Sequence, residues 1–179
     1  MSNIEHTYWF VMRDLKRSNA KNPAWRVLAD KGFEIFTPMR ERLRDISGKK
    51  IRERVPVIPD LLFVKSVAGA IDDELLKIPT LQYRFVKGAP YRTPMVVPDA
   101  DMERFIAAVS TVDNPVYYLP SELTADMCGR WVRIVDGPLA GYEGRLLKVR
   151  GITKRKLLIS LRDFVTAAVE VDKNYIQFI

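Results

Sequence analysis

Hydrophobic and polar positions change their period several times along the first third of the chain. Residues 8–12 form a continuous aromatic and aliphatic run, YWFVM, which is typical of a buried strand. Apolar residues then recur at helical spacing over 22–31, which predicts a helix, and the alternation over 33–38 predicts a second strand. The expected apolar stripe of the helix consists of Trp25, Leu28 and Ala29.

Charged residues replace this pattern from residue 40 to residue 54. Ser47 and Gly48 form a turn signal in the middle of the segment, so we expect a hairpin with a basic tip. Strand character returns in PVIPDLLFVK, where the prolines restrict a regular ladder to Leu61 onward.

Three further elements complete the N-terminal region. A short helix is expected over 72–78, with Asp72 as its cap, and a strand over 82–87. A longer helix opens at 98–101, and its apolar positions at helical spacing are Met102, Phe105, Ile106 and Val109. Together these elements form an alternating α and β unit of residues 1–110.

The sequence changes character after residue 110. Residues 111–125 contain two prolines and no sustained periodicity, which is typical of a linker. The runs VRIV, GRLLKV, KLLISL and AAVEV then alternate with turn signals and predict five short strands in a small antiparallel barrel. We therefore predict an α+β protein with a domain at 1–110, a linker at 111–125 and a β-barrel at 126–179.

Composition narrows the classes of function. The 179 residues include 29 Lys and Arg against 22 Asp and Glu, a net charge of +7 that suits a polyanion or an acidic partner, although many ordinary domains are as basic. Cys128 is the single cysteine, and no Cys or His cluster is spaced for zinc, so we expect no disulfide, metal or cofactor. Without an N-terminal leader or a long apolar run, we expect a cytoplasmic monomer with no membrane contact.

Catalytic chemistry has little support in the sequence. His6 is the single histidine and lies near the N-terminus, and Cys128 has no histidine to activate it. The phosphate-binding and dinucleotide-binding glycine motifs are missing from the sequence. We therefore expect a binding protein without catalytic residues.

The basic hairpin is a candidate surface for phosphate groups. Alternation places Arg40, Arg42 and Arg44 on one strand face, and Arg52 and Arg54 are expected beside them across the hairpin. Such a stripe suits phosphate contact, but a solvated hairpin charged for solubility remains an alternative. No aromatic residue is present for base stacking. The expected nucleic-acid-binding residues are Arg40, Arg42, Arg44, Lys49, Lys50, Arg52 and Arg54.

The most specific sequence motif is VRIVDGPLAGYEGRLLKVRG, at residues 132–151. Two strands flank a bend whose glycines can take positive φ or allow two strands of a tight barrel to approach closely. Any strongly bent hairpin would favour such glycines, so the pattern alone leaves the function open. Its defining residues are Val132, Gly137, Pro138, Gly141, Tyr142 and Gly144.

This stretch resembles a KOW motif, which is found in ribosomal proteins and at the C-terminus of NusG-type transcription factors. The preceding part resembles the NusG N-terminal (NGN) domain, through Trp9-Phe10-Val11 and through the strand that begins at Pro59-Asp60-Leu61. The two motifs occur in the family's order, and the resemblance covers nearly the whole chain.

The resemblance implies an NGN domain that docks on the clamp helices of the largest RNA polymerase subunit through an apolar depression. The residues expected to line it are Trp9, Ile58, Pro59, Leu61 and Phe85. Trp9 and Phe85 could instead belong to the core, and Leu61 stands where the family usually has Tyr. The resemblance also implies that the basic hairpin lies near DNA, either the upstream duplex or the non-template strand.

In relatives, the C-terminal barrel recruits the termination factor Rho or a ribosomal protein through a loop that commonly reads Ile-Phe-Gly-Arg. Here the corresponding residues include Leu161, Arg162 and Phe164, so a ribosomal protein remains a possible partner and Rho is a doubtful one. The departure resembles specialised antitermination paralogues of the RfaH or capsule-operon (UpxY-like) kind. A general NusG factor and a KOW-type RNA- or ribosome-binding protein without polymerase contact are the alternatives. RfaH-like proteins can refold this domain into a helical hairpin; the β-compatible C-terminal sequence gives little reason to expect it here and leaves the question open.

Overall fold

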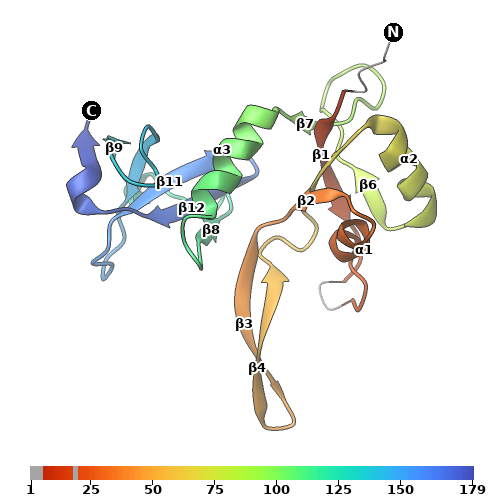
Figure 1. Cartoon of the computed structure of the whole chain (residues 1–179), viewed down its shortest axis with the longest axis horizontal. Coiled ribbons are helices and arrows are strands. Elements are labelled where there is room, and N and C mark those ends of the chain that lie inside the picture. The colour runs from red at the N-terminus through yellow and green to blue at the C-terminus, as the bar shows by residue number, and fades with distance from the viewer. Residues whose placement is uncertain (1–5, 18–19) are drawn as a thin grey trace. The chain divides into compact units, whose positions relative to one another are not determined.

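The computed structural model describes residues 6–17 and 20–179, so the first five residues, which entered the expectation about a leader, lie outside the described part. Two compact units follow one another along the chain, one up to Asp99 and one from Ala100 to Ile179. Figure 1 shows their helices and strands. Each unit is described separately.

The N-terminal unit contains an antiparallel sheet whose central strand comes from the first apolar run. Its strands are β1 (Tyr8–Asp14), β2 (Glu34–Phe36), β5 (Leu62–Ser66), β6 (Leu81–Tyr83) and β7 (Val96–Val97). Their order is β2-β5-β1-β6, and β7 also pairs with β1. The expected strand over 82–87 is shorter than predicted, because the regular ladder ends at Tyr83. Beyond it the Arg84 N–H still donates to the carbonyl of Val11, and Phe85 forms an isolated bridge with Pro94.

Two helices, α1 (Ala24–Asp30) and α2 (Ala68–Lys77), pack on one face of this sheet. The core there includes Phe10 from β1, Leu28 from α1 and Ile71 from α2. The predicted stripe of α1 is partly wrong, because Ala29 is exposed and Ala24 is buried instead. The start of α2 at Asp72 is also wrong, since four earlier residues add a turn that buries Ile71.

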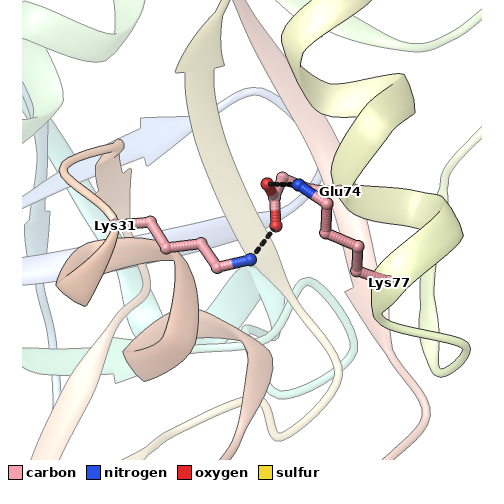
Figure 2. Close-up of polar contacts among 3 residues, drawn as sticks. All are labelled: Lys31, Glu74 and Lys77. Atoms are coloured by element: carbon pink, nitrogen blue, oxygen red, sulfur yellow. Dashed lines mark hydrogen bonds and ion pairs between the residues drawn. The ribbon is translucent and has the colours of Figure 1, made fainter.

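A buried carboxylate links the two helices. Glu74 of α2 accepts hydrogen bonds from Lys31, which follows α1, and from Lys77 one turn along α2 (Figure 2). These two ammonium groups hold the pKa of Glu74 below its ordinary value, although burial acts in the opposite direction. The ionised carboxylate therefore contributes to the packing of α1 against α2.

The predicted basic hairpin is present and consists of β3 (Met39–Ile46) and β4 (Lys49–Pro56). All eight residues of β3 pair with β4, around a turn in which Ser47 and Gly48 have φ of 55° and 82°. Positive φ at both turn positions matches the right-handed twist of a two-residue hairpin. In Figure 1 the hairpin extends as a separate two-stranded ribbon from the sheet that carries α1 and α2.

The C-terminal unit begins at Ala100, the second residue of α3 (Asp99–Val109), and continues as a six-stranded antiparallel sheet. The strands are β8 (Val116–Tyr118), β9 (Cys128–Ile134), β10 (Glu143–Leu147), β11 (Lys156–Leu161), β12 (Val165–Glu170) and β13 (Ile176–Phe178). Short 3-10 helices precede β9 and β13, η1 (Ala125–Met127) and η2 (Lys173–Tyr175). The strand order is β13-β9-β10-β11-β12-β8.

The segment expected to be a linker contributes to this sheet. Val116–Tyr118 pairs with β12, and the ring centroid of Tyr117 lies 6.5 Å from that of Phe105 in α3. The Tyr142 hydroxyl also donates to the carbonyl of Arg104 at 2.8 Å. These contacts place the division between units at the start of α3, whereas the prediction put it after residue 110.

The α+β class with antiparallel sheets is confirmed, as is a β-rich C-terminal unit. The helix predicted from Pro98 is α3, and the four runs named in the sequence lie in β9 to β12. The fifth strand was predicted without a position, and the structure has it as β13. Sequence periodicity missed β7 and β8, because strands of two and three residues are too short to show a period.

Candidate functional site

The apolar residues expected to bind a partner divide into buried and accessible sets. Trp9 is only 1% exposed and Leu61 only 3% exposed. Trp9 pairs in register with Lys65 of β5 and Val97 of β7, and the Lys65 ammonium lies 5.8 Å from its ring centroid. Both buried side chains are structural, so they offer no surface to a partner.

Ile58, Pro59 and Phe85 form the accessible set. Ile58 is half-buried, Pro59 is exposed and the Phe85 side chain is 42% exposed. An ion pair of 3.5 Å between Arg84 Nη2 and Asp60 Oδ2 joins the segments that carry Pro59 and Phe85. Asp60 and Arg84, which are 24 positions apart in sequence, are thereby brought to one region of the N-terminal unit.

Phe85 belongs to a row of aromatic rings that crosses the sheet. Its centroid is 6.3 Å from that of Tyr83, which is 5.4 Å from that of Phe10. The Tyr83 hydroxyl donates to Asp72 Oδ1 at 2.9 Å, and burial together with this bond raises the tyrosine pKa. The contact with Tyr83 holds the Phe85 side chain in place, although its ring is partly exposed.

Other exposed apolar side chains of this unit were missed from the sequence. The turn after Phe85 lacks periodicity, so no pattern could separate its exposed residues from core residues. The exposed members near β1 and Phe85 are Tyr8, Val86, Tyr91 and Val96.

The register of the hairpin decides which cations share a face. Alternate residues of a strand point to the same side, and so do directly opposed residues of an antiparallel pair. Arg40, Arg42 and Arg44 of β3 therefore share a face. Lys49 joins them, since it is opposite Ile46. The expectation that Arg52 and Arg54 lie beside these arginines is wrong: they pair with Leu43 and Glu41 and lie on the other face, with Lys50.

Carboxylates neutralise the two faces unequally. Arg42 pairs with Glu53 at 3.1 Å, and Arg52 pairs with Glu41 at 3.8 Å. The arginine face carries four cations against one carboxylate, whereas the opposite face carries three cations against Glu41 and Asp45. Among the described residues of the hairpin, three cations on the first face have no ion-pair partner, Arg40, Arg44 and Lys49. On the second face, Lys50 and Arg54 have none.

The KOW-like glycines are explained by close packing. A Cβ on Gly144 would lie 2.5 Å from the carbonyl oxygen of Leu158 in the neighbouring strand. A Cβ on Gly137, which has φ of 78°, would lie 2.7 Å from a ring carbon of Tyr175. Between them, Gly141 donates to the carbonyl of Ile134 at 2.8 Å and closes the bend. Of the remaining motif positions, Val132 is in the core, Pro138 is exposed and Tyr142 is half-buried.

The expected partner loop is the turn between β11 and β12. Leu161 is buried, while Arg162 has φ of 46° and its guanidinium pairs with Asp101 of α3 at 3.0 Å. Phe164 is half-buried. The arginine at this turn is therefore held by a carboxylate of its own unit.

Residues 6–17 and 20–179 contain no group of three or more His, Cys, Asp or Glu side chains that could hold a metal ion. None of the helices within these residues combines the length and the apolar character needed to cross a membrane.

Comparison with known proteins identifies the family. Residues 7–106 match the family model described as "NusG: Transcription termination factor nusG", which covers more than half of the chain. The chain belongs to the NusG family. NusG proteins are transcription factors that generally bind RNA polymerase. No curated protein sequence matches the chain.

A solved structure described as "Domain interaction in Thermotoga maritima NusG" is similar to the chain. It is 12% identical, covers 97% of this chain and 98% of that chain, and superposes with a TM-score of 0.48. The family match itself ends at residue 106, near the end of α3.

Proposed function

We propose that this NusG-family protein binds elongating RNA polymerase through its N-terminal unit and suppresses pausing or termination, at particular long operons. The match of residues 7–106 to the family carries the proposal. Binding alone would change elongation, because a factor that binds the processive state of the polymerase more tightly shifts the equilibrium toward that state.

The proposed polymerase surface consists of Ile58, Pro59 and Phe85, and its partner is the clamp-helix tip of the largest subunit. An exposed aromatic ring beside smaller apolar side chains suits the groove-type binding of a helix. The buried Leu61 donates its backbone N–H to the carbonyl of Ile58 at 3.2 Å and so anchors the segment with Pro59 to the core. The Arg84–Asp60 ion pair fixes the relative position of its two segments.

Capture by purified RNA polymerase tests this surface. Phe85→Ser removes the exposed ring, and an anchor worth about 2 kcal/mol corresponds to a loss of affinity of roughly 30-fold. Leu76→Ser is the matched control, because Leu76 is 86% exposed on α2 and lies outside the proposed surface. Equal capture of both variants would refute the surface, and failure of the unaltered chain to bind polymerase would refute the function.

The hairpin is proposed to contact DNA through the face that carries Arg40, Arg44 and Lys49. This face has the larger excess of positive charge and the larger number of unpaired cations within the described residues. Phosphate contacts release counterions, so each contact contributes about 0.9 to the slope of log affinity against log salt on duplex DNA.

Two double variants with equal charge loss test the face. Arg40→Gln with Arg44→Gln should lower the salt slope by roughly 2 on DNA in an elongation complex, if each side chain contacts one phosphate. Lys50→Gln with Arg54→Gln alters the opposite face and should leave most of the slope intact. Equal effects of the two pairs would indicate general charge attraction and contradict a directed contact.

The turn at Arg162 supports a specialised antitermination function rather than that of a general NusG factor. A positively charged side chain paired with Asp101 replaces the apolar anchor that the family commonly presents there. On a template with Rho-dependent terminators, the protein is expected to increase read-through. Increased termination with Rho would instead favour the general NusG function.

A further inference from the structure

A basic groove lies at one end of the C-terminal sheet and belongs to neither surface described above. The groove has a volume of about 600 Å³ and is bounded by the start of β9, the loop that joins β10 to β11, and Phe178 near the end of the chain. All its lining residues come from one unit. Its shape therefore follows from the fold of that unit alone.

The charges that line the groove have a single sign. Arg130, Lys148, Lys154 and Arg155 contribute to its wall, and its lining contains no Asp or Glu. Among the ion pairs of the described residues, Lys154 is the member of this set with a carboxylate partner, Glu170 at 2.9 Å. Three cations thus remain uncompensated around one concave surface, which favours a ligand with several negative charges.

Aromatic and apolar groups accompany these cations. The Phe178 side chain is 49% exposed at the groove, and the guanidinium carbon of Arg130 lies 4.3 Å from its ring centroid. Val149 and Ile152, both exposed, provide apolar wall. The β3–β4 hairpin has cations without any aromatic side chain, so the two basic surfaces differ in chemistry.

We propose that this groove binds a single strand of nucleic acid, with the cations on the phosphates and a base stacked at Phe178. Successive phosphates match a row of uncompensated cations, and an exposed ring beside a guanidinium is the platform on which unpaired bases stack. A duplex hides its base faces and would use only the charges. An acidic protein segment would likewise have no need for the exposed ring.

Fluorescence anisotropy with the full chain tests the proposal. The probes are labelled 12-nucleotide oligo(U) RNA and oligo(dT) DNA, and Arg40→Gln with Arg44→Gln is present throughout to weaken the hairpin surface. Lys148→Gln with Arg155→Gln should reduce the salt slope by roughly 1.4, since each phosphate contact contributes about 0.7 on single strands. The matched control is Arg133→Gln with Lys173→Gln, two cations of the same unit outside the groove lining, which should leave the slope unchanged.

Stacking is tested by Phe178→Leu, which keeps an apolar side chain. Affinity should fall by about 5- to 150-fold, the range expected for one base on one ring, while the salt slope stays constant. Unchanged affinity would overturn the stacking step. An oligo(Glu) peptide that binds as tightly as the RNA, and equally well to Phe178→Leu, would overturn the proposal in favour of an acidic protein partner.

Cys128 provides a local measurement that needs no groove variant. It is the single cysteine, lines the groove and is half-buried. Saturating oligo(U) or oligo(dT) should slow its reaction with a thiol reagent several-fold, and the more protective oligonucleotide identifies the preferred strand chemistry. Binding without any protection would place the nucleic acid elsewhere and overturn the proposal. Polymerase binding is not required in either assay, so the result is independent of the proposed polymerase surface.

Discussion

Gly144 allows the close approach of two strands in the KOW-like barrel, and replacing it with Ala should destabilise the C-terminal unit. A Cβ at this position would lie 2.5 Å from the carbonyl oxygen of Leu158 and 3.2 Å from Leu157 Cδ1. The first of these atoms is backbone, so relief requires movement of β11 away from β10. Overpacking costs about 1–3 kcal/mol, and one weakened ladder hydrogen bond adds about 1 kcal/mol. We expect a total loss of roughly 2–4 kcal/mol.

Hydrogen exchange measured by mass spectrometry reports each unit separately, which a single melting curve of a two-unit chain does not. Peptides from β10 and β11 of Gly144→Ala should exchange about 30- to 1000-fold faster, corresponding to that loss, while peptides from α1 and α2 keep their rates. Gly151→Asn is the control, because Gly151 has φ of 82° with no atom within 4 Å of a built Cβ, and Asn tolerates positive φ. Equal exchange in Gly144→Ala and the unaltered protein would refute the close-approach explanation.

Three further predictions concern the N-terminal unit. Glu74→Gln should lower its stability by about 1–2 kcal/mol at pH 7, as charged hydrogen bonds are lost but Lys31 stays partly solvated. Because the pKa of Glu74 is lowered in the folded state, the stabilisation by its carboxylate is fully present above the ordinary pKa of 4.5 and should vanish as the pH falls through the folded pKa. A stability difference between Glu74→Gln and the unaltered protein that persists at acid pH would contradict the ionised bridge. Gly69→Ala should stabilise α2 by about 0.4–1 kcal/mol in denaturant unfolding, since a Cβ there meets nothing within 4 Å, and destabilisation would refute this. Tyr83→Phe should abolish the bond to Asp72 and accelerate exchange in the middle of α2, where Asp72 lies; unchanged protection would show that ring packing alone suffices.

Local sequence patterns predicted the elements that are long or have distinctive turns. The continuous run at 8–12 became the central strand, and Ser47-Gly48 correctly placed the hairpin turn. Ala29 and Asp72 show the limit of this reasoning, because the packing of each helix, rather than its periodicity or cap signal, decided the buried face and the first turn.

The candidate surfaces were less predictable. The resemblance to the NGN domain placed Trp9 and Phe85 in one apolar depression, yet Trp9 lies in the core and Phe85 is exposed. The positions of Arg52 and Arg54 depended on the cross-strand register, in which a shift of one residue exchanges the faces. Phe178 was missed, since a single ring near the chain end has no motif; its meaning depends on Arg130, which is distant in sequence.

Site-specific photocross-linking in a reconstituted elongation complex tests the central claim most directly. A photoreactive phenylalanine analogue at Phe85 should cross-link to the clamp helices of the largest polymerase subunit, and the same analogue at Leu76 should not. The two positions belong to the same unit and both are exposed, so they differ in surface rather than in accessibility. Cross-linking from Leu76 but not from Phe85 would contradict the proposed docking surface, and the absence of polymerase cross-links from either position would contradict polymerase binding by this unit.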